Sequence, residues 1–466
     1  MPRWFLYSTY CEDYGRTVSH GCEGVEVEIS ELSSLRWENP GGCTMIDERV
    51  DVVVIGGGPA GLAAAVSAKQ HGAERVMVLE RNSWLGGILP QCIHDGFGVE
   101  ETGTSMTGPE YAEKYIERGE KQGIQFMTET MVLRFDEKLE IIAVNKKGIY
   151  RIRATAIVLS TGCREKTRWH AMIPGTRPSG IYTAGVAQAF INLYNIMPGK
   201  NVVILGSGDV GLIMARRLKF EGAHVLAVLE ILPYASGLPR NIVQCLDDYG
   251  IPLYLNHTVT AIAGKERLEQ VTIQQVDEHM IPIPGTEKQI PCDTLLLSLG
   301  LIPENELAKS VGIEIDTITG GPVINQRLET TLSGVFACGN CLQVYDTVDM
   351  LSLDAKKAGE HAAEHSIQKH KNTVPQGKKR VMNVLPGAGV RYVVPQRVTE
   401  DGAVHFTLRA QKPGGTATLR VIAGEQELLK KKLPWVNPVS MISVDVNIPA
   451  EIITSAKTVE VTISDH

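Results

Sequence analysis

The stretch that decides the fold reads Val-Val-Val-Ile-Gly-Gly-Gly-Pro-Ala-Gly over residues 52–61. Its apolar run predicts a buried parallel strand, and the Gly-x-Gly-x-x-Gly that follows has the spacing of a dinucleotide-binding turn. A second copy reads Val-Val-Ile-Leu-Gly-Ser-Gly-Asp-Val-Gly over residues 202–211. In each copy an acid, Glu80 or Glu230, follows the last glycine by nineteen residues. One such match is weak evidence, but two matches predict a chain that binds two dinucleotides.

Each part of this pattern has a physical role. The first glycine allows the tight turn, the second lets the backbone approach a diphosphate, and the third lets the next helix pack against the strand. That helix offers its N-terminal N–H groups to the phosphates. Second strands at residues 75–79 and 223–229 lead to the two acids, whose carboxylates can accept hydrogen bonds from ribose hydroxyls. Because Glu230 would repel a 2′-phosphate and no arginine follows it, the second site is predicted to favour NADH over NADPH.

The bulk composition excludes several classes of protein. The chain has 466 residues, which is enough for two or three domains. With 46 basic and 53 acidic residues its net charge is −7, which gives no sign of a nucleic-acid partner or an anionic membrane. No apolar run is long enough to span a membrane, and no signal peptide is recognisable. Nine scattered cysteines match neither a secreted disulfide scaffold nor a metal site, so we expect a cytoplasmic protein without a metal.

Residues 1–44 form an extension that shows no hydrophobic periodicity. The first strand pattern begins just after Met45, and residues 41–45 are what a ribosome-binding site ahead of a start codon encodes when it is translated in frame. We therefore hypothesise that Met45 is the true start and that residues 1–44 are not translated. A metal-binding extension is the alternative, but the spacing of its three cysteines matches no ligand pattern.

The rest of the chain predicts one unit inserted into another. Between the two glycine patterns we expect a helix at 105–123, strands at 125–127 and 131–135, a hairpin about 146–148, and a buried strand at 154–159 that opens into Ser160-Thr161-Gly162. The sheet of the second unit is expected to continue through 252–255 and 271–273. A buried strand at 294–300 and a helix at 349–369 are then expected to return to the first unit.

A different pattern follows a polar linker at residues 371–379. Short alternating strands at 390–394, 404–408, 417–421 and 459–463 predict an immunoglobulin-like β-sandwich over residues 380–466. This part has no cysteine and no cluster of acids and bases, so we expect it to serve packing or partner docking.

Five segments, in this order, carry a family resemblance: Gly56 to Gly61, Ser160 to Gly162, Gly206 to Gly211, Gly300-x-x-Pro303 and Gly339-Asn340. Together they resemble the two-domain pyridine-nucleotide flavoproteins, which include thioredoxin reductase, over about residues 45–370. The resemblance implies an α/β fold in which a Rossmann-like FAD-binding domain, residues 45–175 and 293–370, carries an inserted Rossmann-like NAD-binding domain, residues 176–292.

The same resemblance implies the cofactor contacts. Those expected for FAD are Gly56, Gly58, Pro59, Ala60, Gly61, Glu80, Arg81, Gly86, Gly87, Val132, Thr161, Gly162, Gly339 and Asn340. Those expected for NAD(H) are Gly206, Gly208, Asp209, Val210, Gly211, Glu230 and Gly300. The family usually has Asp in place of Asn340. The amide keeps an acceptor oxygen and adds a donor, so FAD binding is expected to survive the change.

A closer resemblance lies in residues 162–165, 173–185 and 346–349. These segments are similar to the flavoprotein subunits of multi-component dehydrogenases for amines and for glycerol 3-phosphate. That resemblance implies that the partner is a second dehydrogenase or redox subunit, in a hetero- or homo-oligomer. Some of these relatives carry an iron–sulfur centre, but no cysteine of this chain lies beyond Cys341, which excludes a C-terminal cluster.

A redox dithiol is the main alternative for the chemistry. The one Cys-x-x-Cys runs from Cys338 to Cys341, across the turn assigned to FAD. Residues three apart in a turn can reach disulfide distance, but buried free cysteine is common and the turn already has a role. The pair is therefore the minority hypothesis. Cys92 and His94 are expected to flank the flavin pocket.

The sequence therefore predicts an FAD-dependent NAD(H) oxidoreductase that exchanges electrons with a partner redox protein, as in a glycerol-3-phosphate dehydrogenase-type complex. No catalytic side chain is assigned, because hydride transfer needs alignment and electrostatics rather than an acid or a base. Two alternatives stay open. One is an NADH-dependent disulfide reductase that uses the Cys338–Cys341 pair, and the other is a non-catalytic flavin-bearing subunit that serves assembly.

Overall fold

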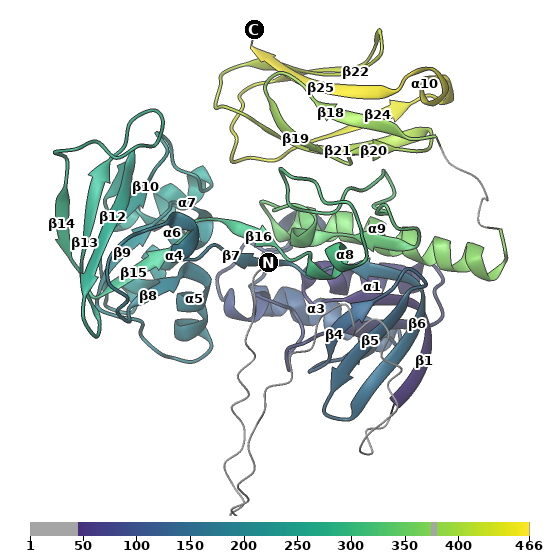
Figure 1. The fold of residues 1–466 in the computed structure, drawn as a ribbon, viewed down its shortest axis with the longest axis horizontal. Helices are drawn as coiled ribbons and strands as arrows, with labels where there is room; N and C mark the ends of the chain where they lie inside the picture. Colours follow the sequence, from purple (N-terminus) through teal and green to yellow (C-terminus); the bar gives the residue numbers. More distant parts are fainter. Residues whose placement is uncertain (1–44, 374–379, 466) are drawn as a thin grey trace, which may run out of the picture. The chain divides into compact units, whose positions relative to one another are not determined.

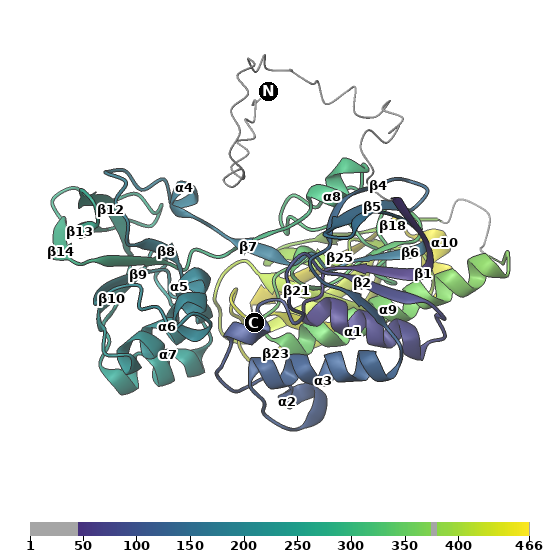
Figure 2. The same cartoon turned by 90° about the horizontal axis from the view of Figure 1, so that it is seen from below.

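The structure is a computed structural model that describes residues 45–373 and 380–465 (Figures 1 and 2). The hypothesis on residues 1–44 and most of the expected linker lie outside these ranges. Within them, no helix is long and apolar enough to cross a membrane.

The first glycine pattern lies in a mixed sheet of seven strands, in the order β3-β2-β1-β6-β5-β4, with β17 paired to the end of β6. Its strands are β1 (Met45–Ile55), β2 (Val76–Leu79), β3 (Gln125–Met127), β4 (Met131–Phe135), β5 (Glu140–Asn145), β6 (Gly148–Leu159) and β17 (Val335–Ala337). β1 runs parallel to β2 and β6, and β6 runs parallel to β17. β5 and β6 form the expected hairpin.

Helices α1 (Pro59–Gln70), α3 (Gly108–Lys121) and α9 (Val348–His370) pack together beside this sheet (Figure 2). Nine consecutive residues of α1, Ala60 to Ala68, are buried, and most are small. Their size lets α9 approach closely, since a Cβ at Gly359 would lie 2.0 Å from the Ala64 carbonyl oxygen. α3 begins later than expected because Thr107 and Glu110 form a capping box there. The short η2 (Leu89–Gln91) and α2 (Val99–Thr102) also belong to this unit.

The second glycine pattern lies in a parallel sheet of five strands, in the order β11-β10-β9-β15-β8. Its strands are β8 (Ile181–Thr183), β9 (Asn201–Leu205), β10 (His224–Glu230), β11 (Leu253–Leu255) and β15 (Thr294–Leu297). Val202 and Ile204 pack against α5 (Ala184–Asn192), α6 (Asp209–Phe220) and α7 (Pro239–Cys245). Val203 and Leu205 face the opposite way, toward a three-stranded antiparallel sheet. Its strands are β12 (His257–Gly264), β13 (Leu268–Gln275) and β14 (Lys288–Pro291).

Two sequence-based expectations about sheet membership are wrong. The strand at 294–297 does not return to the first unit, because β15 is fully buried in the second sheet, where it pairs with β9 on one side and with the edge strand β8 on the other. Residues 271–273 belong to β13 in the three-stranded sheet rather than to the parallel one. The chain passes between the units through β7 (Cys163–Glu165) and β16 (Leu301–Pro303), which pair antiparallel. We therefore propose that this ladder, rather than residues 175 and 293, marks the domain boundary.

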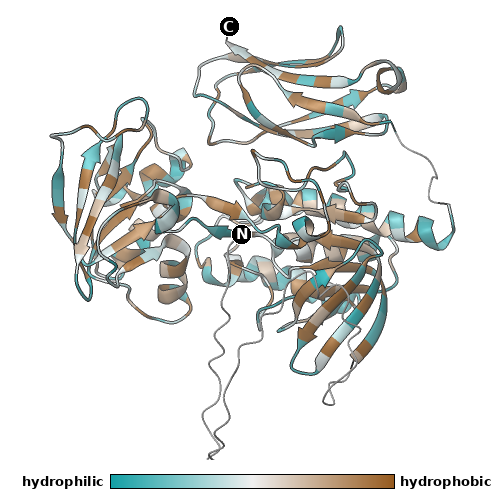
Figure 3. Ribbon diagram, in the orientation of Figure 1, coloured by the Kyte–Doolittle hydropathy of each residue, from teal (hydrophilic) through white to brown (hydrophobic). Residues whose placement is uncertain are grey.

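The C-terminal residues form a β-sandwich. One sheet has the order β20-β18-β25-β22-β23 and the other β19-β21-β24. The strands are β18 (Met382–Pro386), β19 (Val390–Val394), β20 (Arg397–Val398), β21 (Gly402–Ala410), β22 (Ala417–Ala423), β23 (Gln426–Leu433), β24 (Ile442–Ile448) and β25 (Thr458–Asp465). Apolar and polar residues alternate along them (Figure 3), and the inward residues form a core of their own. The remaining helical turns are α4 (Arg168–Ala171), η3 (Asp247–Tyr249), α8 (Glu306–Ser310), η4 (Gly339–Cys341) and α10 (Ala450–Ser455).

Candidate cofactor sites

The segments expected to bind FAD meet at one edge of the first sheet. A Cβ at Gly56, whose φ is +108°, would lie 2.3 Å from the carbonyl oxygen of Ser160, so the turns after β1 and β6 are in contact. Cys338 donates its N–H to the carbonyl of Leu159 at 3.0 Å, which places the turn after β17 beside them. The carboxyl edge of neighbouring parallel strands is where open α/β sheets bind ligands.

The start of α1 at this edge suits a diphosphate. Its N-cap, Gly58, makes no side-chain capping hydrogen bond, and the first turn has no acidic residue. The first backbone N–H groups therefore have no capping acceptor from that residue and are free to bind an anion. Gly87 and Gly339 lie against this turn, since their Cβ atoms would be 3.0 Å from the Gly58 Cα and 2.6 Å from the Ala60 Cβ. Larger side chains at these positions would fill the cradle, so the residues present fit the group.

Glu80, the acid expected to bind a ribose, is held in place by backbone hydrogen bonds. Its side chain is buried, Oε2 accepts the N–H of Gly57 at 2.7 Å, and Oε1 accepts the N–H of Asn82 at 2.8 Å. Thr130 donates its N–H to the Glu80 carbonyl at 2.8 Å. The expected contact Val132 follows Thr130 by two residues. The Val132 side chain itself packs in the core, whereas Arg81 is exposed.

Three other residues expected to bind FAD differ in whether the protein already occupies their hydrogen-bonding groups or the space around them. Thr161 donates its hydroxyl to the Glu304 carbonyl at 2.6 Å, so this side chain ties down the strand that crosses between the units. Gly162 has a φ of +70° and open space around the position of a Cβ. Asn340 accepts the N–H of Tyr345 on Oδ1 at 3.2 Å, and its amide contacts the Cys163 thiol. The carboxylate usual in the family could not donate to that thiol.

The segments expected to bind NAD(H) meet at the corresponding edge of the second sheet. A Cβ at Gly206, with a φ of +97°, would lie 2.1 Å from the carbonyl oxygen of Ser298, which follows β15. Gly300, two residues further on, has open space around it. A Cβ at Gly211 would lie 2.7 Å from the Ser298 Cβ, so α6 packs tightly against the turn, and Val210 lies half-buried beside it.

The start of α6 differs from that of α1 because it has an acidic residue in its first turn. N-cap Gly208 makes no side-chain capping bond. The carboxylate of Asp209 accepts the N–H of Leu238 at 2.8 Å and the amide of Asn241 at 2.7 Å. Because its acceptor Oδ1 is engaged by these two donors, Asp209 ties the following loop to the helix.

Glu230 repeats the arrangement of Glu80 with more partners. It is buried, and its Oε2 accepts the hydroxyl of Ser207 at 2.5 Å and that of Ser236 at 2.8 Å. Its Oε1 accepts the N–H of Leu232 at 3.0 Å. Sequence reasoning missed Ser236. The signal was present, since Ser236 follows Glu230 by six residues, just as Gly86 follows Glu80.

The geometry weighs against a redox dithiol. Cys338 and Cys341 are both fully buried free thiols. Burial raises the pKa of each, and Cys341 donates to the carbonyls of Leu159 and Cys338. Burial likewise raises the pKa of Cys92 to about 12. His94 is half-buried and its ring lies against Phe97 at a tilt, with ring centroids 5.0 Å apart. These thiols thus lack the depressed pKa of a reactive cysteine, and residues 45–373 and 380–465 hold no group of acids, cysteines and histidines suited to a metal.

The two cofactor edges adjoin the same ladder. β7 starts directly after Gly162, and β16 starts directly after Gly300. Glu304 donates its N–H to the Gly162 carbonyl at 3.0 Å, and Lys166 donates to the Gly300 carbonyl at 2.9 Å. The two glycines are therefore about four residues apart along the ladder, or roughly 13 Å.

Two Rossmann-like units joined in this way are the architecture expected of a two-domain pyridine-nucleotide flavoprotein. The comparisons with known proteins agree with this class. A model of the pyridine nucleotide-disulphide oxidoreductase family matches residues 50–377. The chain belongs to this family, whose members use FAD and NAD(P)H. The match ends before the sandwich begins.

Individual relatives are distant. A subunit of the opine oxidase of Agrobacterium tumefaciens is 26% identical over 319 residues, which is 64% of this chain and 62% of the relative. NADH oxidase of Methanocaldococcus jannaschii is 26% identical over 313 residues, 64% of each chain. The chain thus spans less than two thirds of these relatives. The crystal structure of T. acidophilum thioredoxin reductase, 22% identical, superposes with a TM-score of 0.57 over 69% of this chain and 99% of that one. This likeness confirms the predicted fold.

Proposed function

We propose that this protein is an FAD-dependent oxidoreductase that passes electrons between NAD(H), bound on the second unit, and a partner redox protein, with FAD on the first unit as the relay. The observation that carries the proposal is the β7–β16 ladder. It joins the turn of one cofactor edge directly to the turn of the other, so both lie at one junction.

The residues at the two edges bind and orient rather than react. The uncapped start of α1 and the glycines around it fit a diphosphate, and Glu80 fits a ribose. When bound, FAD would supply two-electron chemistry, the exchange of a hydride with the nicotinamide and of a proton with water. Such a transfer requires alignment of the two rings and no side-chain acid or base.

The second unit is proposed to prefer NADH. Glu230 keeps its carboxylate in the buried position where a ribose would bind, beside the hydroxyls of Ser207 and Ser236. A 2′-phosphate placed there would meet the carboxylate, and Ile231 and Leu232 offer no positive charge to offset the repulsion.

We propose that the partner of this chain is a second redox subunit. The opine oxidase relative supports this proposal, because its name makes it one subunit of its enzyme. So do the segments 162–165, 173–185 and 346–349, which resemble subunits of glycerol-3-phosphate and amine dehydrogenase complexes. The sandwich, outside the family match, is proposed to serve packing or docking in that complex.

Anaerobic titration of the purified, FAD-loaded protein with NADH tests the proposal. The visible flavin absorbance should bleach with one equivalent of NADH and return on admission of an oxidant. A yellow protein that NADH does not bleach would instead be a flavin-bearing assembly subunit. A preparation that stays colourless in excess FAD would overturn the proposal. Co-purification from the native host, with identification of the bound chains, tests the partner.

A further inference from the structure

The β-sandwich forms hydrogen bonds and an ion pair with the segment that links the proposed FAD turn to α9. This segment, residues 339–347, starts at Gly339-Asn340 and ends at the N-cap of α9. Gln343 donates its amide to the hydroxyl of Thr407, on β21, at 2.7 Å, and both side chains are buried. Arg409, two residues along β21, donates to the carbonyl of Val344 at 3.1 Å. The family match does not include this strand.

The strongest of these contacts is an ion pair between Arg409 and Asp346. Their side chains are only 12% and 14% exposed. Asp346 also accepts the N–H of Met441 at 2.6 Å, and Arg409 also donates to the hydroxyl of Tyr392 at 3.0 Å. Burial would lower the pKa of Arg409, but Tyr392 and Asp346 together raise it, so the guanidinium stays charged. A buried pair with this many partners fixes the positions of both backbones.

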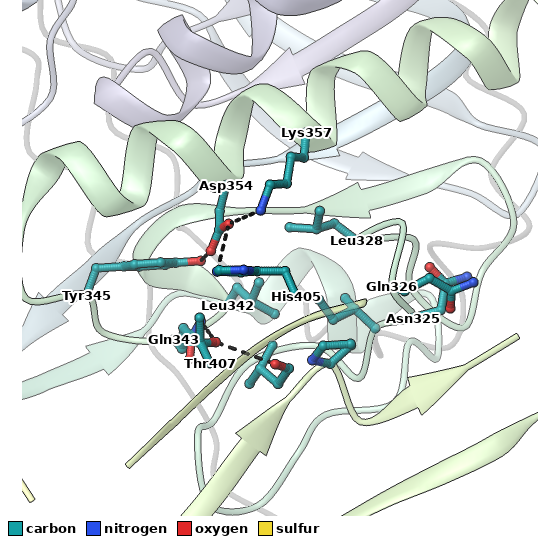
Figure 4. Close-up of a pocket in the computed structure, with 13 residues that line it drawn as sticks. Asn325, Gln326, Leu328, Leu342, Gln343, Tyr345, Asp354, Lys357, His405 and Thr407 are labelled. Carbon is teal, nitrogen blue, oxygen red and sulfur yellow. Dashed lines mark hydrogen bonds and ion pairs between the residues drawn. The ribbon is translucent and has the colours of Figure 1, made fainter. Parts of the chain in front are cut away.

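From this segment the contacts lead to the FAD turn through Tyr345. Its N–H is the donor that holds Oδ1 of Asn340 at 3.2 Å. Its hydroxyl donates to Asp354 of α9 at 3.0 Å, beside a small pocket of about 30 Å³ that His405 and Thr407 of the sandwich also line (Figure 4). Asn340 is therefore held on one side by a residue that lies between two contacts of the sandwich, Gln343 and Asp346.

We propose that Arg409 is a positioning residue for FAD. Through Asp346 and Val344 it holds the 339–347 segment so that Tyr345 keeps Asn340 in the geometry that binds the cofactor. The sandwich would then have a role in flavin binding that its lack of reactive side chains does not suggest. This inference rests on the FAD site of the proposed function. The sandwich has a core of its own, but Tyr392 and Val394 of β19 pack in the core of the first unit.

The test compares full-length variants. Arg409→Met removes the charge at similar length and should weaken FAD binding at least tenfold, measured by fluorescence titration of the deflavinated protein. The visible flavin spectrum of the loaded variant should also shift, and Arg409→Lys should recover part of the affinity. Arg397→Met is the matched control. Arg397 also pairs across to the first unit, with Glu314, which is not part of the 339–347 segment, so FAD binding should stay within twofold of wild type.

Every outcome decides the proposal. A folded Arg409→Met variant with wild-type FAD affinity overturns it, as does equal weakening by Arg397→Met, because the sandwich would then act only by general docking. If Arg409→Met does not fold, Thr407→Val takes its place: loss of the bond to Gln343 should weaken FAD about threefold, and an unchanged affinity would refute the idea. Failure of the proposed function looks different, because the wild-type protein would not bind FAD at all.

Discussion

At the scale of single residues, Glu80 and Glu230 are both buried carboxylates that accept hydrogen bonds from the neighbouring glycine turn, but their hydrogen-bond donors differ. Glu80 is held by two backbone N–H groups, from Gly57 and Asn82. At Glu230, serine replaces glycine inside the turn, and a second serine arrives from the following loop. Hydroxyls can rotate and either donate or accept. The second site can therefore rearrange its hydrogen bonds, as the proposed binding and release of NAD(H) there would require.

The first prediction concerns Glu230. Glu230→Ala should raise the Kd for NADH at least about tenfold, because hydrogen bonds to a charged group contribute roughly 1.5–3 kcal/mol. The preference for NADH over NADPH should shrink as well. Ser236→Ala leaves the carboxylate in place and should weaken NADH only about threefold. Stopped-flow reduction of the flavin over a range of NADH and NADPH concentrations gives both constants, and an unchanged NADH affinity in Glu230→Ala would place the nicotinamide elsewhere.

The second prediction concerns the buried thiols. Cys341→Ser should keep more than about half of the NADH-dependent turnover, because burial raises the thiol pKa and little thiolate forms near pH 7. Turnover with an artificial electron acceptor is the measurement, with FAD content determined on the same sample. Loss of turnover with full FAD content would restore the disulfide reductase hypothesis.

At the scale of elements, a buried carboxylate joins α2, α3 and α9. Glu101 of α2 accepts the hydroxyls of Tyr111 and Tyr115 from α3, at 2.6 and 2.8 Å, and the ammonium group of Lys356 from α9, at 2.7 Å. Burial alone would raise the pKa of Glu101, but these three donors hold it below its ordinary value of 4.5. The cluster therefore stabilises the packing of three helices as long as the carboxylate is charged.

The third prediction follows from that charge. A depressed pKa means that the folded state gains stability from Glu101 above the ordinary pKa and loses it as pH falls through the folded value. Glu101→Gln should lower the free energy of unfolding at pH 7 by about 1.5–3 kcal/mol, because Lys356, whose side chain is 32% exposed, loses its charged partner. Its stability should depend less on pH below about 4.5 than that of the wild type.

Chemical denaturation across pH 3–8 measures this third effect. Glu117→Gln is the control, since Glu117 forms an exposed pair with Lys121 and should change the stability by less than about 1 kcal/mol. Equal effects of the two variants would show that the buried cluster has no special role.

The elements also show what the sequence can and cannot predict. Local patterns gave α9 to within one residue and several strands almost to the residue, because buried runs and hairpin turns are local signals. They could not assign β15 to its sheet, since a strand buried on both faces has the same composition whichever neighbours it pairs with. Likewise, the segment 346–349 was named for its family resemblance, but the partner of Asp346, Arg409, is 63 residues away and was found only in the fold.

At the scale of the whole molecule, the chain repeats one dinucleotide-binding pattern, and the short β7–β16 ladder joins the two copies. Each unit has a glycine turn pressed against the residue that follows a neighbouring strand, Ser160 in one case and Ser298 in the other. The repetition was predictable from the spacing of glycines and acids. The sequence pattern could not predict which copy binds FAD and which binds NAD(H), because both copies have the same backbone arrangement. That assignment depends on the family resemblance.

The fourth prediction separates the two copies with matched variants. In Gly56→Ala the new Cβ would lie 2.3 Å from the Ser160 carbonyl, and in Gly206→Ala 2.1 Å from that of Ser298, both at positive φ. Gly56→Ala should therefore purify without its yellow colour. Gly206→Ala should stay yellow but resist bleaching by NADH concentrations that fully reduce the wild type. Gly222→Ala, also at positive φ but with open space around the Cβ, should behave as wild type in both assays. A Gly206→Ala protein that loses flavin while Gly56→Ala keeps it would reverse the assignment of FAD and NAD(H) to the two units.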